Sequence, residues 1–188
     1  MTKFLLPLVL IFHLWILSKF TFTAWPEMLS YPYLFSKGFV LYKDFILPYP
    51  PGLILILSSF FKLFGFSPMA LKIFTWIYIL IIDLLIFLVL KKITHSLKLA
   101  LIFLLIFVFL QSSLDGNMLW FDIATVIPLL LAFLFTLIWI EKKLPSYLFL
   151  VGVFLSMAVL IKQIDIIYFP FFIFFPGKPR IWNVSKPL

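Results

Sequence analysis

Long apolar runs separated by short polar breaks make up most of this sequence. The runs cover residues 4–20, 73–90, 99–113, 122–140 and 147–161. Each approaches the length of about 20 residues with which a helix crosses the hydrocarbon core of a membrane. Each is apolar on all sides rather than on one face, which is typical of helices surrounded by lipid or protein. The pattern predicts an all-α membrane protein with about five or six transmembrane helices.

Residues 52–64 form a shorter apolar run, and the placement of this run decides the topology. A helix of this length is about 20 Å long, too short to span comfortably. If it spans, the lysines of the later polar breaks face outward; if it lies in the membrane interface, they face the cytoplasm with Lys3. Those lysines are Lys91, Lys92, Lys98, Lys142 and Lys143. The positive-inside rule favours the second arrangement, with a cytoplasmic N-terminus and one long outer loop at 21–68. We expect interfacial helices near 27–37 and at 52–64.

Composition supports a single transmembrane domain over residues 1–188. Hydrophobic residues make up 65% of the chain, charged residues 12%, and the mean hydropathy is +1.23, which excludes an ordinary soluble domain. The net charge of +8 comes from lysines between apolar runs, so it indicates membrane orientation and not nucleic-acid binding. Cysteine is absent, which excludes disulfides and thiolate metal sites.

In this topology the acidic residues sort to one side of the membrane. Five of them fall on the outer face, namely Glu27, Asp44, Asp115, Asp122 and Asp165. Lys162 ends an apolar run at the same face. Carboxylates from separate loops at one face predict a polar site at the membrane boundary. The alternative is that each acid is a solvated loop residue, and Asp115 in Leu-Asp-Gly fits a turn.

A few polar or small residues inside the apolar runs have local interpretations. Asp83 must face protein or water, and its partner stays open. His13 is expected to pack or to form a hydrogen bond. Gly152 and Ser156, four residues apart, predict a closely packed helix face. The last run, 166–175, contains Pro170 and is either a short span or part of a broken helix, so the side of the C-terminus stays open.

Several short motifs follow one another along the chain. They are Trp-Pro-Glu at 25–27, Gly-x-x-Leu-Tyr-Lys-Asp at 38–44, a Pro-Pro pair opening a short helix that ends in Leu-Phe-Gly at 63–65, basic residues at 91–92, Phe-Asp at 121–122, and a glycine-containing run that ends at Lys162. In this order they resemble the N-terminal half of the GT-C superfamily of membrane glycosyltransferases. That superfamily includes the protein O-mannosyltransferases and the lipid A aminoarabinose transferases.

The resemblance implies transfer of a sugar from a polyprenyl-phosphate donor to an acceptor hydroxyl on the outer face of the cell (inner) membrane. One carboxylate suffices as the base for the hydroxyl. A lysine or a divalent metal would stabilise the charge on the leaving phosphate. Membrane lipid and the lipid-linked sugar are the implied partners. Family members are longer, so we expect this chain to be truncated, with a missing C-terminal half or a second subunit as a further partner.

The resemblance also assigns catalytic candidates. Glu27 is the first candidate for the base, because the family's catalytic acid comes early in the first outer loop. Asp44 is the second candidate, and its alternatives are an ion pair with Lys43 or a helix N-cap. Tyr42 and Lys43, from the same motif, are candidate substrate-binding residues.

Two further candidates come from later in the chain. Asp122 corresponds to the acid that family members use for metal or substrate contact, and its alternative is the N-cap of the following helix. Lys162 corresponds to a lysine near the lipid phosphate. Asp165, three residues on, is the expected partner of Lys162 on the same helical face.

A second class of function remains open at this point, a small non-enzymatic membrane protein such as a transporter, flippase or assembly subunit. A transporter is expected to carry its charges near mid-bilayer on broken helices and often to show an internal repeat. The sequence shows no repeat, and its acids sort to one face. The enzyme is therefore favoured.

Overall fold

The computed structural model describes residues 5–114 and 116–174, and this part of the chain consists of helices and the segments that connect them. In chain order the elements are α1 (Leu5–Lys19), α2 (Glu27–Ser36), α3 (Gly52–Phe64), α4 (Pro68–Thr94), α5 (Leu97–Ser113), α6 (Phe121–Lys142), α7 (Pro145–Ile161), the 3₁₀ helix η2 (Gln163–Ile167) and α8 (Tyr168–Phe174). The all-α prediction is confirmed for the described residues. The predictions for Lys3, Asp115 and the end of the run 166–175 fall outside them.

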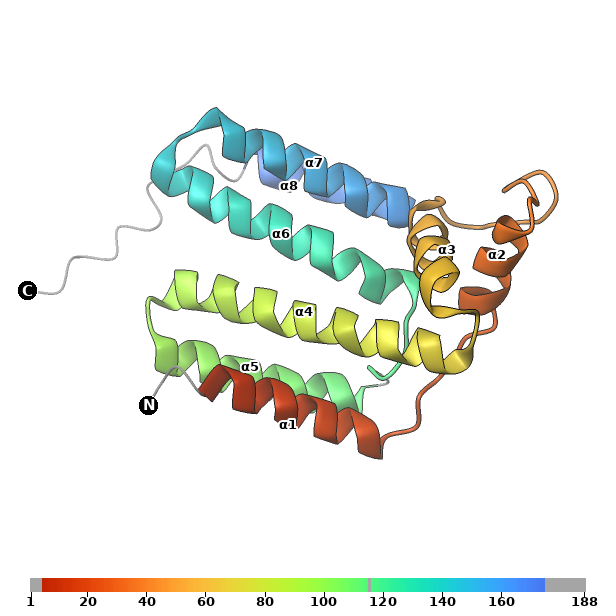
Figure 1. Ribbon diagram of the computed structural model, residues 1–188. Coiled ribbons are helices and arrows are strands. Elements are labelled where there is room, and N and C mark those ends of the chain that lie inside the picture. The colour runs from red at the N-terminus through yellow and green to blue at the C-terminus, as the bar shows by residue number, and fades with distance from the viewer. Residues whose placement is uncertain (1–4, 115, 175–188) are drawn as a thin grey trace, which may run out of the picture.

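The helices form a bundle that is covered at one end. Figure 1 shows α1, α4, α5, α6 and α7 side by side along a common direction, with α2 and α3 packed across one end, here called the capped end. The α4–α5 and α6–α7 connections lie at the other end, here called the lysine-rich end. Its lysines are Lys91, Lys92, Lys98, Lys142 and Lys143. The short helix α8 returns alongside α7 from the capped end (Figure 1).

Two of the described helices are long and apolar enough to cross a membrane, α4 with 27 residues and α6 with 22. Helices α1, α3, α5 and α7 are also apolar but have 10–17 residues. Helix α4 begins at Pro68, before the apolar run at 73. The Ser67 hydroxyl accepts a hydrogen bond from the Ala70 N–H at 3.1 Å, and proline suits the first helical position, so the cap extends the helix.

Helices form at 27–36 and 52–64, in the two segments where the sequence predicts them. Helix α3 buries Leu53, Leu57 and Phe61, spaced four residues apart, against the bundle. It ends at Phe64, and the C-cap residue Gly65 has a φ of 85°, a conformation that favours glycine. That α2 and α3 lie in a membrane interface stays a prediction.

The outside of the bundle is apolar. Large hydrophobic side chains are exposed along α1 and α7, with Ile11 63% exposed and Phe149 72% exposed. Contiguous exposed apolar surface of this kind is rare on soluble monomers and marks contact with a membrane or a partner. Together with the two long apolar helices, it indicates a membrane protein.

Inside the bundle, a polar network centred on two buried side chains joins three helices. His13 of α1 lies with its Nδ1 2.7 Å from Asp83 Oδ2 of α4, and both side chains are 0% exposed. The other ring nitrogen, Nε2, is 2.8 Å from Gln111 Oε1 of α5. The expectation that His13 forms a hydrogen bond is confirmed, and His13 is the partner that the sequence left open for Asp83.

The network continues into the segment that leads to α6. The Gln111 amide donates to the Gly116 carbonyl at 2.6 Å. The Asn117 amide donates to the carbonyls of Leu17 and Phe20 at 3.1 and 3.0 Å, while its oxygen accepts from the Trp76 ring N–H at 2.9 Å. The start of α6 is therefore tied to the end of α1 and to α4.

Breaking this network is expected to destabilise the bundle. The variant His13→Leu leaves the Asp83 carboxyl buried without its main partner, which costs about 3–5 kcal/mol when one member of a buried pair is removed. The thermal unfolding midpoint in detergent measures the loss. The double variant His13→Leu/Asp83→Leu removes both polar groups and should recover much of it. A midpoint unchanged in His13→Leu would contradict the role given to the pair.

Candidate functional site

The loop between α2 and α3 folds around its own acid. The Asp44 carboxylate accepts a hydrogen bond from the Val40 N–H at 2.6 Å, and the Asp44 N–H donates to the Val40 carbonyl at 3.0 Å. Gly38 and Tyr42 have positive φ angles of 90° and 66°. Lys43 is exposed beside this turn. Asp44 thus closes the turn of the Gly-x-x-Leu-Tyr-Lys-Asp motif.

Aromatic contacts dock this loop onto the start of α6. The Tyr42 hydroxyl donates to the Tyr49 carbonyl at 2.9 Å. The Tyr49 ring stacks on Phe121 with a centroid separation of 4.1 Å and meets Trp120 edge-on at 6.4 Å. Trp25 packs on Trp120 at 5.3 Å. These rings surround the position at which Asp122 enters the first turn of α6.

At that position an ion pair joins two helix ends. The Lys162 ammonium donates to Asp122 Oδ1, linking the C-cap of α7 to the first turn of α6. This hydrogen bond is the main cause that raises the pKa of Lys162, and burial opposes the increase. The Tyr49 hydroxyl contributes a smaller electrostatic effect in the same direction. The structure therefore brings together Asp122 and Lys162, which are 40 residues apart in sequence.

Close backbone packing holds Lys162 in this place. A Cβ atom on Gly52, the first residue of α3, would lie 2.5 Å from the Leu160 carbonyl oxygen of α7. Only glycine lets α3 approach the last turn of α7 so closely. Beyond Lys162, the Gln163 amide donates to the Pro48 carbonyl at 3.3 Å. The Pro-Pro-Gly motif therefore positions the end of α7.

Asp165 lies under the ion pair. It is 5% exposed, and its Oδ2 is buried and has no hydrogen-bond partner among the described residues. Burial raises the pKa of the Asp165 carboxyl above its ordinary 3.8, while Lys162 and the Thr125 hydroxyl oppose this shift. The sequence predicts Asp165 as the partner of Lys162. The structure gives Lys162 a hydrogen bond to Asp122 instead, and Asp165 acts on it only electrostatically.

Glu27 stands at the start of α2, in the same packed region. Its Oε2 is buried without a hydrogen-bond partner among the described residues. The sequence neighbours of three candidates, Met28, Phe121 and Ile161, belong to one buried hydrophobic cluster. This shared core draws the backbones next to Glu27, Asp122 and Lys162 together. Within the described residues, the Glu27 carboxylate itself makes no ion pair with Lys162, whose salt bridge is to Asp122.

The described residues hold no cluster of metal-ligating side chains at the capped end. In residues 5–114 and 116–174, no group of three or more His, Cys, Asp or Glu side chains could hold a metal ion. Asp122 is paired with an ammonium group, and the nearby Asp165 is buried. A metal contact at Asp122 stays a prediction.

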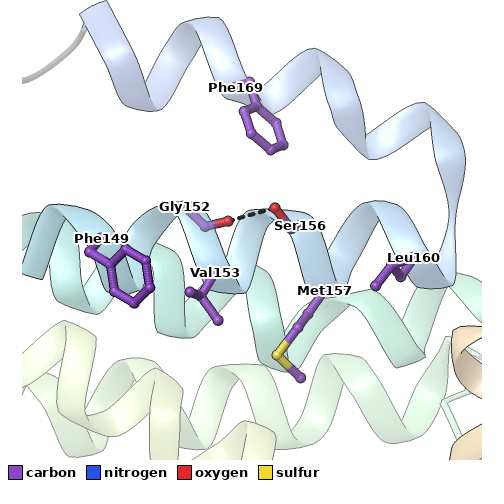
Figure 2. A pocket seen from close by; sticks show the side chains of 7 residues that line it. All are labelled: Phe149, Gly152, Val153, Ser156, Met157, Leu160 and Phe169. Carbon is purple, nitrogen blue, oxygen red and sulfur yellow. Dashed lines mark hydrogen bonds between the residues drawn. The ribbon is translucent and has the colours of Figure 1, made fainter.

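An apolar groove runs along α7 toward the ion pair. It has a volume of about 530 Å³ and is lined by one face of α7 and by Phe169 of α8. Figure 2 shows Gly152 and Ser156 facing Phe169 across open space, with Leu160 near the turn into η2. A Cβ on Gly152 would meet no atom within 4 Å, so the prediction that Gly152 and Ser156 form a closely packed face is wrong. The groove ends at Leu160, just before Lys162.

These features define a class of protein: a membrane-embedded helix bundle with a charged, aromatic-lined site at one end and an apolar groove leading to it. The model of the family described as dolichyl-phosphate-mannose-protein mannosyltransferase matches residues 49–188. The chain belongs to that family, which makes it a membrane glycosyltransferase of the GT-C type. No curated protein matches the chain, and no solved structure matches it.

Sequence reasoning did not single out three residues that shape the site. Tyr49 and Gly52 lie in the Tyr-Pro-Pro-Gly stretch, where a glycine directly after two prolines at a helix start is itself a signal of close backbone approach. Asn117 sits in a polar break and offers no comparable signal, because its partners are separated from it by up to 100 residues.

Replacing Gly52 with alanine is expected to displace α3 from α7. The added Cβ would strike the backbone of Leu160, which cannot rotate away, and overpacking of this kind costs about 1–3 kcal/mol. The thermal unfolding midpoint in detergent measures this loss. Gly152→Ala in α7 is the matched control, because its Cβ meets open space and alanine favours a helix, so its midpoint should not fall. Equal losses in the two variants would contradict the assignment.

The buried acid predicts a pH dependence of stability. The folded protein binds the Asp165 proton more tightly than the unfolded chain does, so protonation of Asp165 adds to the free energy of unfolding. This stabilisation is complete below the ordinary pKa of 3.8 and is lost as the pH rises through the raised pKa. Asp165→Asn stays neutral, so its unfolding midpoint should fall less than that of the native protein over that interval. If the unfolding midpoint depends on pH equally in the native protein and in Asp165→Asn, the Asp165 carboxyl does not contribute to the pH dependence of stability.

Proposed function

We propose that this protein transfers a sugar from a polyprenyl-phosphate donor to an acceptor hydroxyl at the outer face of the cell membrane. The observation that carries the proposal is the Asp122–Lys162 pair at the end of an apolar groove. A lipid-linked donor needs both features at once, a cation for its phosphate and an apolar surface for its isoprenoid chain. Membership of the family supports the reaction class.

The donor phosphate is proposed to bind Lys162. In the unliganded site the lysine is held by Asp122, whose side chain is 62% exposed. Ion pairs this open to solvent are worth only about 0–1 kcal/mol, so a phosphate competes with the carboxylate at little cost. The isoprenoid chain would then lie along the α7 groove, past Leu160 and toward Phe149 (Figure 2).

The acceptor hydroxyl is proposed to be activated by Glu27. Its oxygen attacks the anomeric carbon while the bond from that carbon to the phosphate oxygen breaks. The hydroxyl proton passes to the Glu27 carboxylate, and the bonding electrons leave with the phosphate, where Lys162 stabilises the charge. A buried carboxylate oxygen without a partner supports Glu27 for this role. Asp44 is the second candidate, but its carboxylate is occupied by the Val40 N–H.

The membrane placement follows from the same proposal. Helices α1, α4, α5, α6 and α7 would cross the bilayer, with α8 returning from the outer face, the N-terminus in the cytoplasm and residues 21–68 outside. The lysine-rich end then faces the cytoplasm, as the positive-inside rule requires. Tyr42 and Lys43 would contact substrate from the outer loop. A second subunit or further chain segments would complete the acceptor side.

A transfer assay tests the proposal. Purified protein in lipid vesicles is incubated with polyprenyl-phosphate mannose carrying a labelled sugar and a cell-envelope fraction as acceptor, and the loss of label from the lipid is followed. Loss of a preorganised charge at Lys162 in Lys162→Met should lower the rate about 100- to 1,000-fold. Loss of the base in Glu27→Gln should lower it about 100- to 10,000-fold.

Lys62→Met provides the matched control, because Lys62 is an exposed lysine of α3 at the same end of the bundle. Its rate should equal that of the native protein. An equal loss in Lys62→Met and Lys162→Met would mean that general surface charge, and not the ion pair, is responsible. Loss of label at the rate of empty vesicles would refute the donor assignment.

A further inference from the structure

A second cavity opens at the lysine-rich end, far from the charged site at the capped end. It lies between the last turns of α4 and α6 and has a volume of about 400 Å³. Its deep wall is apolar, formed by Phe133, Leu137 and Ile140 of α6. Its mouth is polar, formed by Lys92, His95 and Glu141.

Lysines outnumber acids at this end of the bundle, and one of them, Lys92, lines the cavity. Lys92 is paired with Glu141 at 2.5 Å, and these side chains are 23% and 50% exposed. Glu141 is the only carboxylate that the described residues place at this end, whereas five lysines lie there. An apolar cavity with a lysine at its rim, at an end of the bundle where lysines outnumber acids, matches an amphiphile that has acyl chains and an anionic head.

We propose that this cavity binds an anionic glycerophospholipid, with the phosphate at Lys92 and an acyl chain along Phe133 and Leu137. Basic pockets between membrane helices are suited to anionic headgroups, because each lysine near the surface contributes about 1 kcal/mol of attraction. The binding site is separate from the transfer reaction, and it does not depend on the identity of the sugar donor.

The lipid phosphate competes with the Glu141 carboxylate for Lys92. Glu141 stands in the last turn of α6, where the helix dipole disfavours a negative charge. Its half-exposed carboxylate is therefore a weak partner, and a phosphate replaces it at Lys92. Removing Lys92 should therefore weaken lipid binding, and removing the charge of Glu141 should strengthen it.

Lipid titration followed by native mass spectrometry tests the proposal on the full chain in detergent. Phosphatidylglycerol and phosphatidylcholine with identical acyl chains are the two probes, and the first should bind more tightly. Lys92→Gln should weaken phosphatidylglycerol binding about fivefold, the loss of one lysine contact. Glu141→Gln should strengthen it, because Lys92 is freed. Lys98→Gln, a lysine at the same end outside the cavity, should leave binding nearly unchanged.

Each alternative occupant gives a different result. Equal binding of the two lipids would show an apolar groove without headgroup recognition, which overturns the proposal. Loss of binding in both Lys92→Gln and Glu141→Gln would show that the ion pair only supports the fold. Displacement of the lipid by glycerol phosphate at equal concentration would indicate a site for a free phosphate. Dimers that exclude lipid would indicate that a second copy of the chain covers the cavity.

Discussion

The buried contact between His13 and Asp83 is the constraint on which the arrangement of the bundle depends. Neither side chain has any exposure, and a buried ionisable group without a partner is expensive in lipid or in protein. The contact therefore fixes the rotation of α1 against α4. Gln111 of α5 binds the second ring nitrogen of His13, so α5 is held by the same contact. The Gln111 amide also donates to the Gly116 carbonyl, which links this contact to the segment before α6. Apolar contacts alone would allow these helices to slide, because every face of them is hydrophobic.

This network positions the Asp122–Lys162 pair through two sets of contacts. The hydrogen bonds of Asn117 hold the segment before α6 against the end of α1. They therefore fix where α6 begins along the axis of the bundle. Phe121 then enters the buried cluster of the capped end together with Ile161, and these two residues precede Asp122 and Lys162. The ion pair is thus placed by packing on its apolar neighbours. Its own interaction energy is too small to bring two helix ends together.

Sequence reasoning succeeded where the signal is local. The long apolar runs predicted helices near their observed positions, and the Pro-Pro pair marked the start of α3. Lys162 and Asp122 were both singled out, but the favoured partner of Lys162 was Asp165, three residues away. The C-cap explains the error, because Lys162 leaves the helical conformation with φ of −145°, and helical spacing no longer relates it to Asp165. The pairing of His13 with Asp83 spans 70 residues, and no local pattern encodes it.

Helix α6 shows how one element serves both ends of the molecule. It carries Asp122 in its first turn, where the helix dipole favours an acid, and Glu141 in its last turn, where the dipole disfavours one. Each acid is paired with a lysine that belongs to the end of another helix, Lys162 of α7 and Lys92 of α4. Both pairs are partly exposed, so in the proposed donor and lipid complexes each lysine would exchange its carboxylate for a phosphate. The two ends of the bundle share the same arrangement, a partly exposed lysine–acid pair beside an apolar cavity.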